Sequence, residues 1–178
     1  MLKIAVASGK GGAGKTSVSA ALVRYLGRGV VAADGDVDAA NGAIALGSKE
    51  LSQKPYYSGK GFRIDPDLCT GCGLCVEACR FEAIFPDGEK CRIEEPLCER
   101  CGVCADLCPE GAILGELRRG GTLMLSELPS GALFSHAELY PGEDTSGKLV
   151  SQVRRQAEEK GKLLGVDFMV IDSPPGIG

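Results

Sequence analysis

Eight of the nine cysteines in this 178-residue chain fall into two copies of one spacing. The copies are Cys69-x2-Cys72-x2-Cys75-x3-Cys79 and Cys98-x2-Cys101-x2-Cys104-x3-Cys108, offset by 29 residues. The same offset continues past the cysteines, because Ala83-Ile84 recurs as Ala112-Ile113. An internal repeat of this kind indicates that two copies of one cofactor-binding half are combined in one unit.

The spacing within each copy suits a [4Fe–4S] cluster, which needs four thiolates at four corners. Three cysteines separated by two residues can wrap one cluster, and the fourth points out of that loop and reaches the other cluster. The two expected ligand sets therefore exchange their fourth members. The first cysteine set is Cys69, Cys72, Cys75 and Cys108, and the second cysteine set is Cys79, Cys98, Cys101 and Cys104.

Two other readings of the cysteines remain open from the spacing alone. Disulfides are typical of secreted chains, and zinc sites usually pair two CxxC units across a longer spacer.

Gly71, Gly73 and Gly102 fit loops that approach a cluster closely. Cys91 lies outside both motifs, and we expect a spare or packed thiol there rather than a ligand.

A glycine-rich segment near the N-terminus could bind phosphate. It reads Gly9-Lys10-Gly11-Gly12-Ala13-Gly14-Lys15-Thr16 and satisfies G-x4-G-K-[ST]. Such a loop turns backbone N–H groups toward phosphates at a helix N-terminus. Lys15 would reach the β- and γ-phosphates, and the Thr16 hydroxyl would bind Mg²⁺. The alternative is a plain glycine-rich turn.

The elements around this loop support a phosphate site. We expect a strand over Leu2–Ala7, a helix over Thr16–Leu26 and a buried strand over Val30–Ala33. A strand, a loop, a helix and a second strand in this order predict a mostly parallel α/β sheet.

The same α/β pattern returns after the cysteines. Short strands are expected at Thr122–Leu125 and Ala132–Phe134, a helix at Lys148–Leu164, and a strand at Asp167–Ile171 that ends in Asp172. One α/β domain would then be interrupted by an insert. The expected divisions are 1–60 for the first part of the α/β domain, 61–115 for the cysteine-rich insert, and 116–178 for the continuation of the α/β domain.

The cysteine repeat resembles the bacterial two-cluster ferredoxins over about 55 residues. The matching segments are Ile64-Asp65-Pro66-Asp67-Leu68-Cys69-Thr70-Gly71-Cys72-Gly73 and Cys104-Ala105-Asp106-Leu107-Cys108-Pro109. The family usually has proline where this chain has Arg80. This resemblance implies two [4Fe–4S] clusters rather than zinc.

The loop with its additional lysine, Lys10, resembles the deviant phosphate loop of the MinD, ParA, Mrp and nitrogenase iron-protein superfamily. The resemblance implies that Lys10 acts across a homodimer on the partner's ATP, offsetting charge on the transferred phosphoryl group. A solvated loop lysine is the alternative. The resemblance also implies catalytic roles for Lys10, Lys15 and Asp36.

Two acidic turns resemble the switches of that superfamily. Asp34-Gly35-Asp36-Val37-Asp38 follows the second strand, and Asp36 is expected to orient the attacking water and hold Mg²⁺ through solvent. Asp34 or Asp38 could share this work, and a plain helix cap is the alternative. Val170-Ile171-Asp172-Ser173-Pro174-Pro175-Gly176 resembles the second switch, which would deliver Asp172 to Mg²⁺.

Taken whole, the chain is similar to MinD-like ATPases with an inserted ferredoxin domain, a resemblance that implies ATP hydrolysis. Members of that subgroup continue beyond the point matching Gly178, so we expect a truncated sequence. Three functions are compatible with the resemblance. ATP could gate electron transfer to a redox partner, drive cluster assembly or delivery to an accepting protein, or run a positioning switch with structural or redox-sensing clusters. The first is preferred because all eight ligands belong to a self-contained ferredoxin.

Composition excludes several other classes. A net charge of −4 argues against a nucleic-acid partner, and no apolar stretch reaches the length of a membrane span. The N-terminus lacks the parts of a secretory signal, so we expect a cytoplasmic protein. His136, the only histidine, is expected in a turn or at the surface, and Arg118-Arg119 is expected as a solvated pair beside a turn.

Overall fold

The computed structural model describes residues 1–38, 41–143 and 146–174. The chain forms two compact units, one from Met1–Tyr56 with Gly120–Gly178 and one from Tyr57–Arg119. We call them the α/β unit and the cysteine-rich unit. The second begins four residues before, and ends four residues after, the insert expected at 61–115. The difference arises because two long strands, β3 (Lys49–Ile64) and β6 (Ile113–Glu127), each run from one unit into the other.

The α/β unit is built on a six-stranded sheet in the order β1-β8-β2-β7-β6-β3. Its other elements are β1 (Leu2–Val6), α1 (Lys15–Leu26), η1 (Gly27–Gly29), β2 (Val30–Asp34), α2 (Gly42–Leu46), β7 (Leu133–Leu139), α5 (Ser146–Leu164) and β8 (Phe168–Asp172). Strands β1, β8, β2 and β7 are parallel, and β6 is antiparallel to β7. The expected mostly parallel α/β sheet is confirmed.

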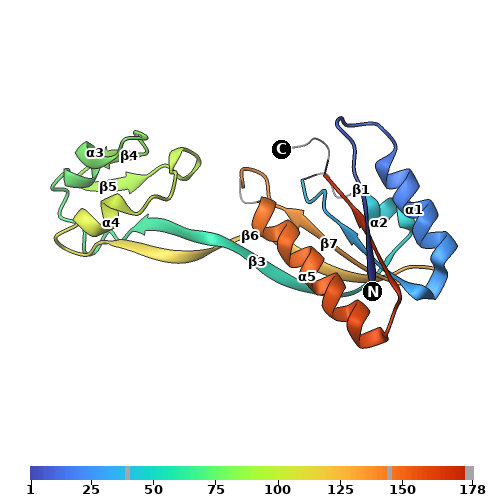
Figure 1. Ribbon diagram of the computed structural model, residues 1–178. Coiled ribbons are helices and arrows are strands. Elements are labelled where there is room, and N and C mark those ends of the chain that lie inside the picture. The colour runs from blue at the N-terminus through green and yellow to red at the C-terminus, as the bar shows by residue number, and fades with distance from the viewer. Residues whose placement is uncertain (39–40, 144–145, 175–178) are drawn as a thin grey trace. The chain divides into compact units, whose positions relative to one another are not determined.

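Helices cover both faces of this sheet, with α5 on one side and α1 on the other (Figure 1). Strand β2 supplies both cores because its side chains alternate between the faces. Val31 and Ala33 pack in the cluster that contains the buried side of α5. Val30 and Ala32 pack with the buried side of α1. A strand buried on both faces carries a continuous apolar run, which is why β2 was recognisable in the sequence.

Strand β3 was not predicted, and β6 is far longer than the expected strand at Thr122–Leu125. Most β3 side chains are exposed, so the strand carries no run of alternating apolar residues. Arg118 and Arg119 lie within β6 rather than beside a turn, and Arg118 forms an ion pair with Glu95. The expectation of a solvated pair at a turn was therefore wrong.

The expectation for His136 was also wrong. The residue lies on β7 with 5% of its surface exposed. Its Nε2 is 2.9 Å from Ser126 Oγ, and its ring stacks on Phe134 at 4.8 Å. The sequence did not indicate this burial because β7 reads Leu-Phe-Ser-His-Ala-Glu-Leu, in which polar residues interrupt the apolar run.

The cysteine-rich unit repeats one backbone pattern twice. It contains α3 (Leu74–Ala78), β4 (Ile84–Asp87), β5 (Lys90–Ile93), η2 (Glu95–Leu97) and α4 (Val103–Leu107). Helices α3 and α4 differ by the 29-residue offset at both ends. The backbone bond from Glu94 N–H to the Ala83 carbonyl recurs from Asp65 N–H to the Ala112 carbonyl, each at 2.8 Å. The antiparallel β4–β5 hairpin therefore corresponds to the ends of β3 and β6 in this unit.

The repeat also determines which residues adopt a left-handed backbone. Gly71 and Arg100, 29 residues apart, have φ values of 68° and 57°. Glu82 and Gly111 form a second such pair, at 51° and 60°. Each pair has glycine in one copy only, although this conformation strains residues with a Cβ. The same backbone conformation therefore recurs in both copies whether or not the residue is glycine.

Candidate functional site

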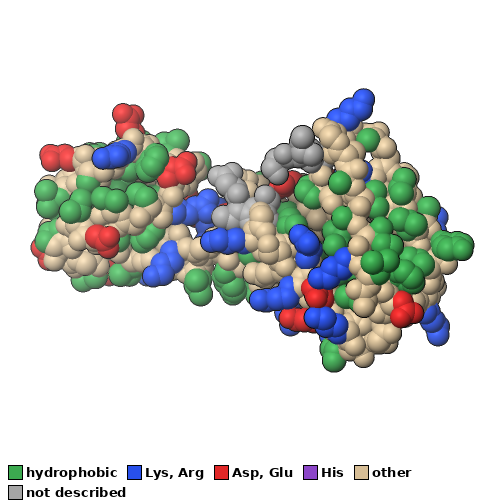
Figure 2. All heavy atoms as spheres, viewed as in Figure 1, with side chains coloured by type: hydrophobic (Ala, Val, Ile, Leu, Met, Phe, Trp, Pro, Cys, Tyr) green, Lys and Arg blue, Asp and Glu red, His purple; other side chains and the backbone are tan. Residues whose placement is uncertain are grey.

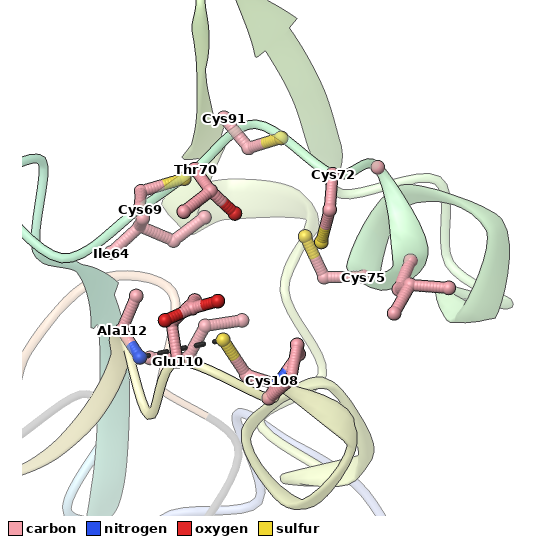
Figure 3. Close-up of a pocket in the computed structure, with 13 residues that line it drawn as sticks. Ile64, Cys69, Thr70, Cys72, Cys75, Cys91, Cys108, Glu110 and Ala112 are labelled. Atoms are coloured by element: carbon pink, nitrogen blue, oxygen red, sulfur yellow. Dashed lines mark hydrogen bonds between the residues drawn. The ribbon is translucent and has the colours of Figure 1, made fainter.

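The first cysteine set lines one pocket, with an empty volume of about 340 Å³ (Figure 3). Cys69, Cys72 and Cys75 come from the first repeat, and Cys108 comes from the second. In Figure 3 these four residues surround the same space from separate segments. The structure thus brings together the four residues that the spacing assigned to one cluster.

The second cysteine set lines a separate pocket of the same volume, about 340 Å³. Cys98, Cys101 and Cys104 come from the second repeat, and Cys79 comes from the first. Most residues lining the two pockets correspond under the 29-residue offset. The exchange of the fourth cysteine between the halves is therefore symmetric.

Backbone groups near each pocket already face sulfur. Ala112 N–H donates to Cys108 Sγ at 3.3 Å, and Ala83 N–H donates to Cys79 Sγ at 3.4 Å (Figure 3 draws the first). These bonds connect the two exchanged cysteines to the Ala-Ile dipeptides that the repeat shares. N–H donors directed at thiolate sulfur favour its charged form, so the donor set fits an iron–sulfur cluster.

The thiols of the first set do not share one environment. A backbone N–H bond from Gly71 lowers the pKa of Cys69 below the usual thiol value. Burial raises the pKa of Cys75, and the neighbouring Cys91 raises it further. Burial likewise raises the pKa of Cys104 in the second set. Iron coordination would offset the cost of ionising the buried thiols, because a coordinating thiol is deprotonated outright.

The structure adds Cys91 to the first pocket. This cysteine lies on β5, is buried, and lines the pocket with the first cysteine set. The expectation of a packed thiol describes its burial, but the sequence did not indicate its position beside the ligands. Its distance in sequence from the motif did not indicate this position, because the β4–β5 hairpin brings it back to the pocket.

No three His, Cys, Asp or Glu side chains of the described residues are placed to hold a single metal ion.

The surface of the cysteine-rich unit carries exposed hydrophobic side chains (Figure 2). They include Leu68, Leu74, Phe81, Phe85, Leu97, Val103 and Leu107. Leu74 lines the first pocket and Val103 the second, and each is about half exposed. These two residues correspond under the repeat offset, so each pocket has an apolar side chain that also reaches solvent.

The glycine-rich loop lies between β1 and α1, as the motif requires. Gly12 and Gly14 have positive φ values of 70° and 83°, and a Cβ on any of Gly9, Gly11, Gly12 or Gly14 would meet nothing within 4 Å. Lys15 Nζ donates to Ser8 Oγ at 3.2 Å, and Ser8 Oγ donates to the Lys10 carbonyl at 2.8 Å. The loop is thus open, and its lysine is held near the backbone that would cradle phosphate. Lys10 and Ala13 are exposed on it.

One pocket behind this loop is lined mostly by apolar residues, and Thr16, Ser19, Asp34 and Asp172 are its hydroxyl and carboxylate side chains. The two aspartates end the adjacent parallel strands β2 and β8, where they face each other in register. Asp172 is 7% exposed, and its Oδ1 has no hydrogen-bond partner among the described residues. A hydroxyl and carboxylate oxygens are the ligand types that Mg²⁺ prefers. The residues present therefore fit a magnesium ion.

Asp34 is the most perturbed acid of this group. Its pKa is raised to about 6, mainly by burial and in smaller part by the nearby Asp172 charge, while the Asp36 N–H bond at 2.9 Å opposes the shift. Asp36 itself is half-buried and is not among the residues lining the pocket. Asp38 is exposed. Asp34 is thus better placed beside Thr16 and Asp172 than the sequence indicated. Pro175 and Gly176 of the expected second switch lie outside the described residues.

In the described part of the chain, no helix is both long enough and apolar enough to cross a membrane.

Comparison with protein families finds the 4Fe–4S binding domain twice, at residues 62–85 and 92–114. The two matches cover the two cysteine motifs of the cysteine-rich unit. They support the expectation of [4Fe–4S] clusters.

A relative and a solved structure were also found. The uncharacterized protein MJ0578 of Methanocaldococcus jannaschii is 36% identical over the whole chain, which spans 61% of that protein. The septum site-determining protein MinD of Pyrococcus horikoshii, solved with Mg-ADP, aligns with 99% of this chain and 50% of its own, at 21% identity and a TM-score of 0.40. The chain thus covers about half to three-fifths of the proteins it matches, and we transfer no residue role from them.

Proposed function

We propose that this protein binds MgATP and two [4Fe–4S] clusters, and that its nucleotide state controls electron transfer through the clusters. The observation that carries the proposal is the pair of matched pockets, each lined by four cysteines drawn from both repeats. They occur in the same chain as an open phosphate loop, behind which Thr16, Ser19, Asp34 and Asp172 line one pocket.

The cysteine-rich unit suits electron transfer better than cluster donation. Each cluster would have four cysteine ligands from this chain alone, with three from one repeat and one from the other. Bound clusters supply one-electron chemistry at potentials set by charge, hydrogen bonds and exposure. Releasing a cluster would require cysteine ligands from both repeats to dissociate from it at the same time. Leu74 and Val103 offer an apolar contact surface beside each pocket for a redox partner protein.

The α/β unit supplies the nucleotide site. Lys15 and the loop from Gly9 to Thr16 would bind the phosphates, and Thr16 and Asp172 would hold Mg²⁺. Asp34 lies beside both and, with Asp36, is a candidate to position the attacking water. We further propose that Lys10 acts on the ATP of a second copy in a homodimer, because it is exposed on the loop rather than packed against its own chain.

The test is the reduction potential of the clusters with and without MgATP, measured anaerobically by EPR-monitored titration. Gating predicts a shift of tens of millivolts with MgATP, and no shift in Lys15→Ala, which retains its clusters. An unchanged potential would reject gating. Transfer of iron and sulfide to an apo-ferredoxin would favour cluster delivery, and nucleotide-dependent assembly without any redox response would favour a positioning switch.

A further inference from the structure

The first cysteine pocket contains five thiols rather than four. Cys91 is 8% exposed and lines this pocket from β5. It belongs to the same cluster of buried side chains as Cys69 and Cys75. In Figure 3 it lies on the opposite side of the pocket from Cys108. The extra thiol is therefore part of the pocket wall and not a surface group.

The second pocket has no such thiol. Under the 29-residue offset Cys91 corresponds to Phe62, and Phe62 lines the second pocket. The two positions also correspond in the structure. The backbone hydrogen bonds beside them, from Glu94 N–H to the Ala83 carbonyl and from Asp65 N–H to the Ala112 carbonyl, are both 2.8 Å long. A phenyl ring in one copy and a thiol in the other is thus a chemical difference between two otherwise matched pockets.

Cys91 lies beside the loop of the first motif. Lys90, the residue before it, donates from Nζ to the Cys69 carbonyl at 2.6 Å. A Cβ on Gly71 would meet the Glu89 carbonyl and approach Lys90 N, so this loop is in direct contact with the start of β5. The chain therefore places Cys91 next to the loop that carries three of the four expected ligands.

We propose that Cys91 is a reserve ligand of the first cluster and can replace Cys75 on iron. The inference rests on the proposed ligation of that cluster by the first cysteine set. Cys75 is the ligand concerned because it and Cys91 line the same pocket and are buried in the same cluster of side chains. In the exchange the Fe–S bond to Cys75 breaks and one to Cys91 forms. The proton of the Cys91 thiol passes to the Cys75 thiolate, and no electron is transferred.

The experiment compares Cys75→Ala with Cys104→Ala, its equivalent in the second pocket. Cys75→Ala should retain about eight irons per chain and show no [3Fe–4S] EPR signal, because Cys91 supplies the fourth thiolate. Cys104→Ala has only Phe62 at the corresponding place. It should lose one iron to give the [3Fe–4S] signal, or lose the second cluster and fall to about four irons.

Two further variants isolate the role of Cys91. Cys91→Ala alone should retain about eight irons, and Cys75→Ala with Cys91→Ala should behave like Cys104→Ala. If Cys75→Ala and the double variant show the same iron content and EPR spectrum, the proposal is overturned. Should alanine make the chain insoluble, Cys75→Ser with and without Cys91→Ala provides the same comparison, since any serine ligation is common to both.

A direct probe is selenocysteine at position 91 in the Cys75→Ala background. X-ray absorption at the selenium edge should then find iron as a neighbour of selenium, and its absence would overturn the proposal. These outcomes are separate from those of the proposed function. A wild-type chain with far fewer than about eight irons would reject the two-cluster assignment itself, before any variant is compared.

Discussion

The two units of this protein build their sites in different ways. In the cysteine-rich unit, one motif is used twice, and each pocket takes three cysteines from one copy and one from the other. In the α/β unit, Thr16, Asp34 and Asp172 come from three separate elements and meet only because β2 and β8 are neighbours. A repeated motif carries its own geometry, whereas a site at the ends of parallel strands depends on strand order.

The largest effect should follow from removing an exchanged cysteine. Cys108→Ala lies in the second motif, but we expect it to damage the first cluster, because its sulfur lines the first pocket. Its EPR spectrum and iron loss should match those of Cys72→Ala. Cys79→Ala should instead match Cys101→Ala. If each variant damaged the cluster of its own motif, the exchange between repeats would be wrong.

Lys15→Ala should impair the nucleotide site of the α/β unit and leave the clusters of the cysteine-rich unit unchanged. We expect MgATP affinity to fall by about 10- to 100-fold, since charge-assisted hydrogen bonds to phosphate contribute about 1.5–3 kcal/mol each. The iron content should be unchanged, because the cysteine pockets contain no residue of the phosphate loop. Lys10→Ala is the control: we expect it to bind MgATP with little change but to hydrolyse it more slowly. Fluorescent nucleotide titration measures MgATP affinity, and phosphate release measures the rate of hydrolysis. If neither variant changed either quantity, the proposal of an ATPase would lose its support.

His136 should make the α/β unit sensitive to acid. Burial lowers its pKa in the folded state to about 4, against 6.5 in the unfolded chain. Between these values the unfolded state binds the additional proton, so stability falls as the pH drops from 6.5 toward 4. From pH 7 to pH 5 this loss is at most about 2 kcal/mol.

The measurement is anaerobic urea unfolding of wild type and His136→Gln at pH 7 and pH 5. Asp34 contributes with the opposite sign, because its raised pKa lets the folded state bind the proton first. The two proteins share Asp34, so their difference isolates His136. An equal acid response in both would show that His136 does not titrate as its burial implies.

A smaller effect tests the symmetry of the repeat backbone. Gly71→Ala should cost at least about 2 kcal/mol, because it combines a left-handed backbone with a Cβ that would lie 2.2 Å from the Glu89 carbonyl oxygen. Glu82→Gly should change stability by no more than about 1 kcal/mol, since relief of strain offsets added freedom of the unfolded chain. Thermal unfolding of the cluster-loaded proteins compares them. A tolerated alanine at position 71 would mean that the loop does not pack against β5 as described.

Several features of the fold were readable from the residues because they depend on local chemistry. The strand before the phosphate loop, helix α1 and strand β2 follow from apolar runs and glycines that are adjacent in sequence. Strand β3 was not readable, since its exposed residues carry no periodic apolar pattern. His136 was misplaced because the burial of a histidine depends on its neighbours in the sheet, here Phe134 on β7 and Ser126 on β6.

The sequence by itself determined the cysteine spacing, the repeat and the phosphate loop, since each is a short pattern whose chemistry is local. The division of eight cysteines into two sets also follows from spacing, and the binding of iron–sulfur clusters by these sets remains a proposal. Tertiary structure decided the rest. Only the pairing of β2 with β8 places Asp34 beside Asp172, and only the return of the β4–β5 hairpin places Cys91 among the first cysteine set. Both are contacts between segments far apart in the chain, for which neighbouring residues carry no signal.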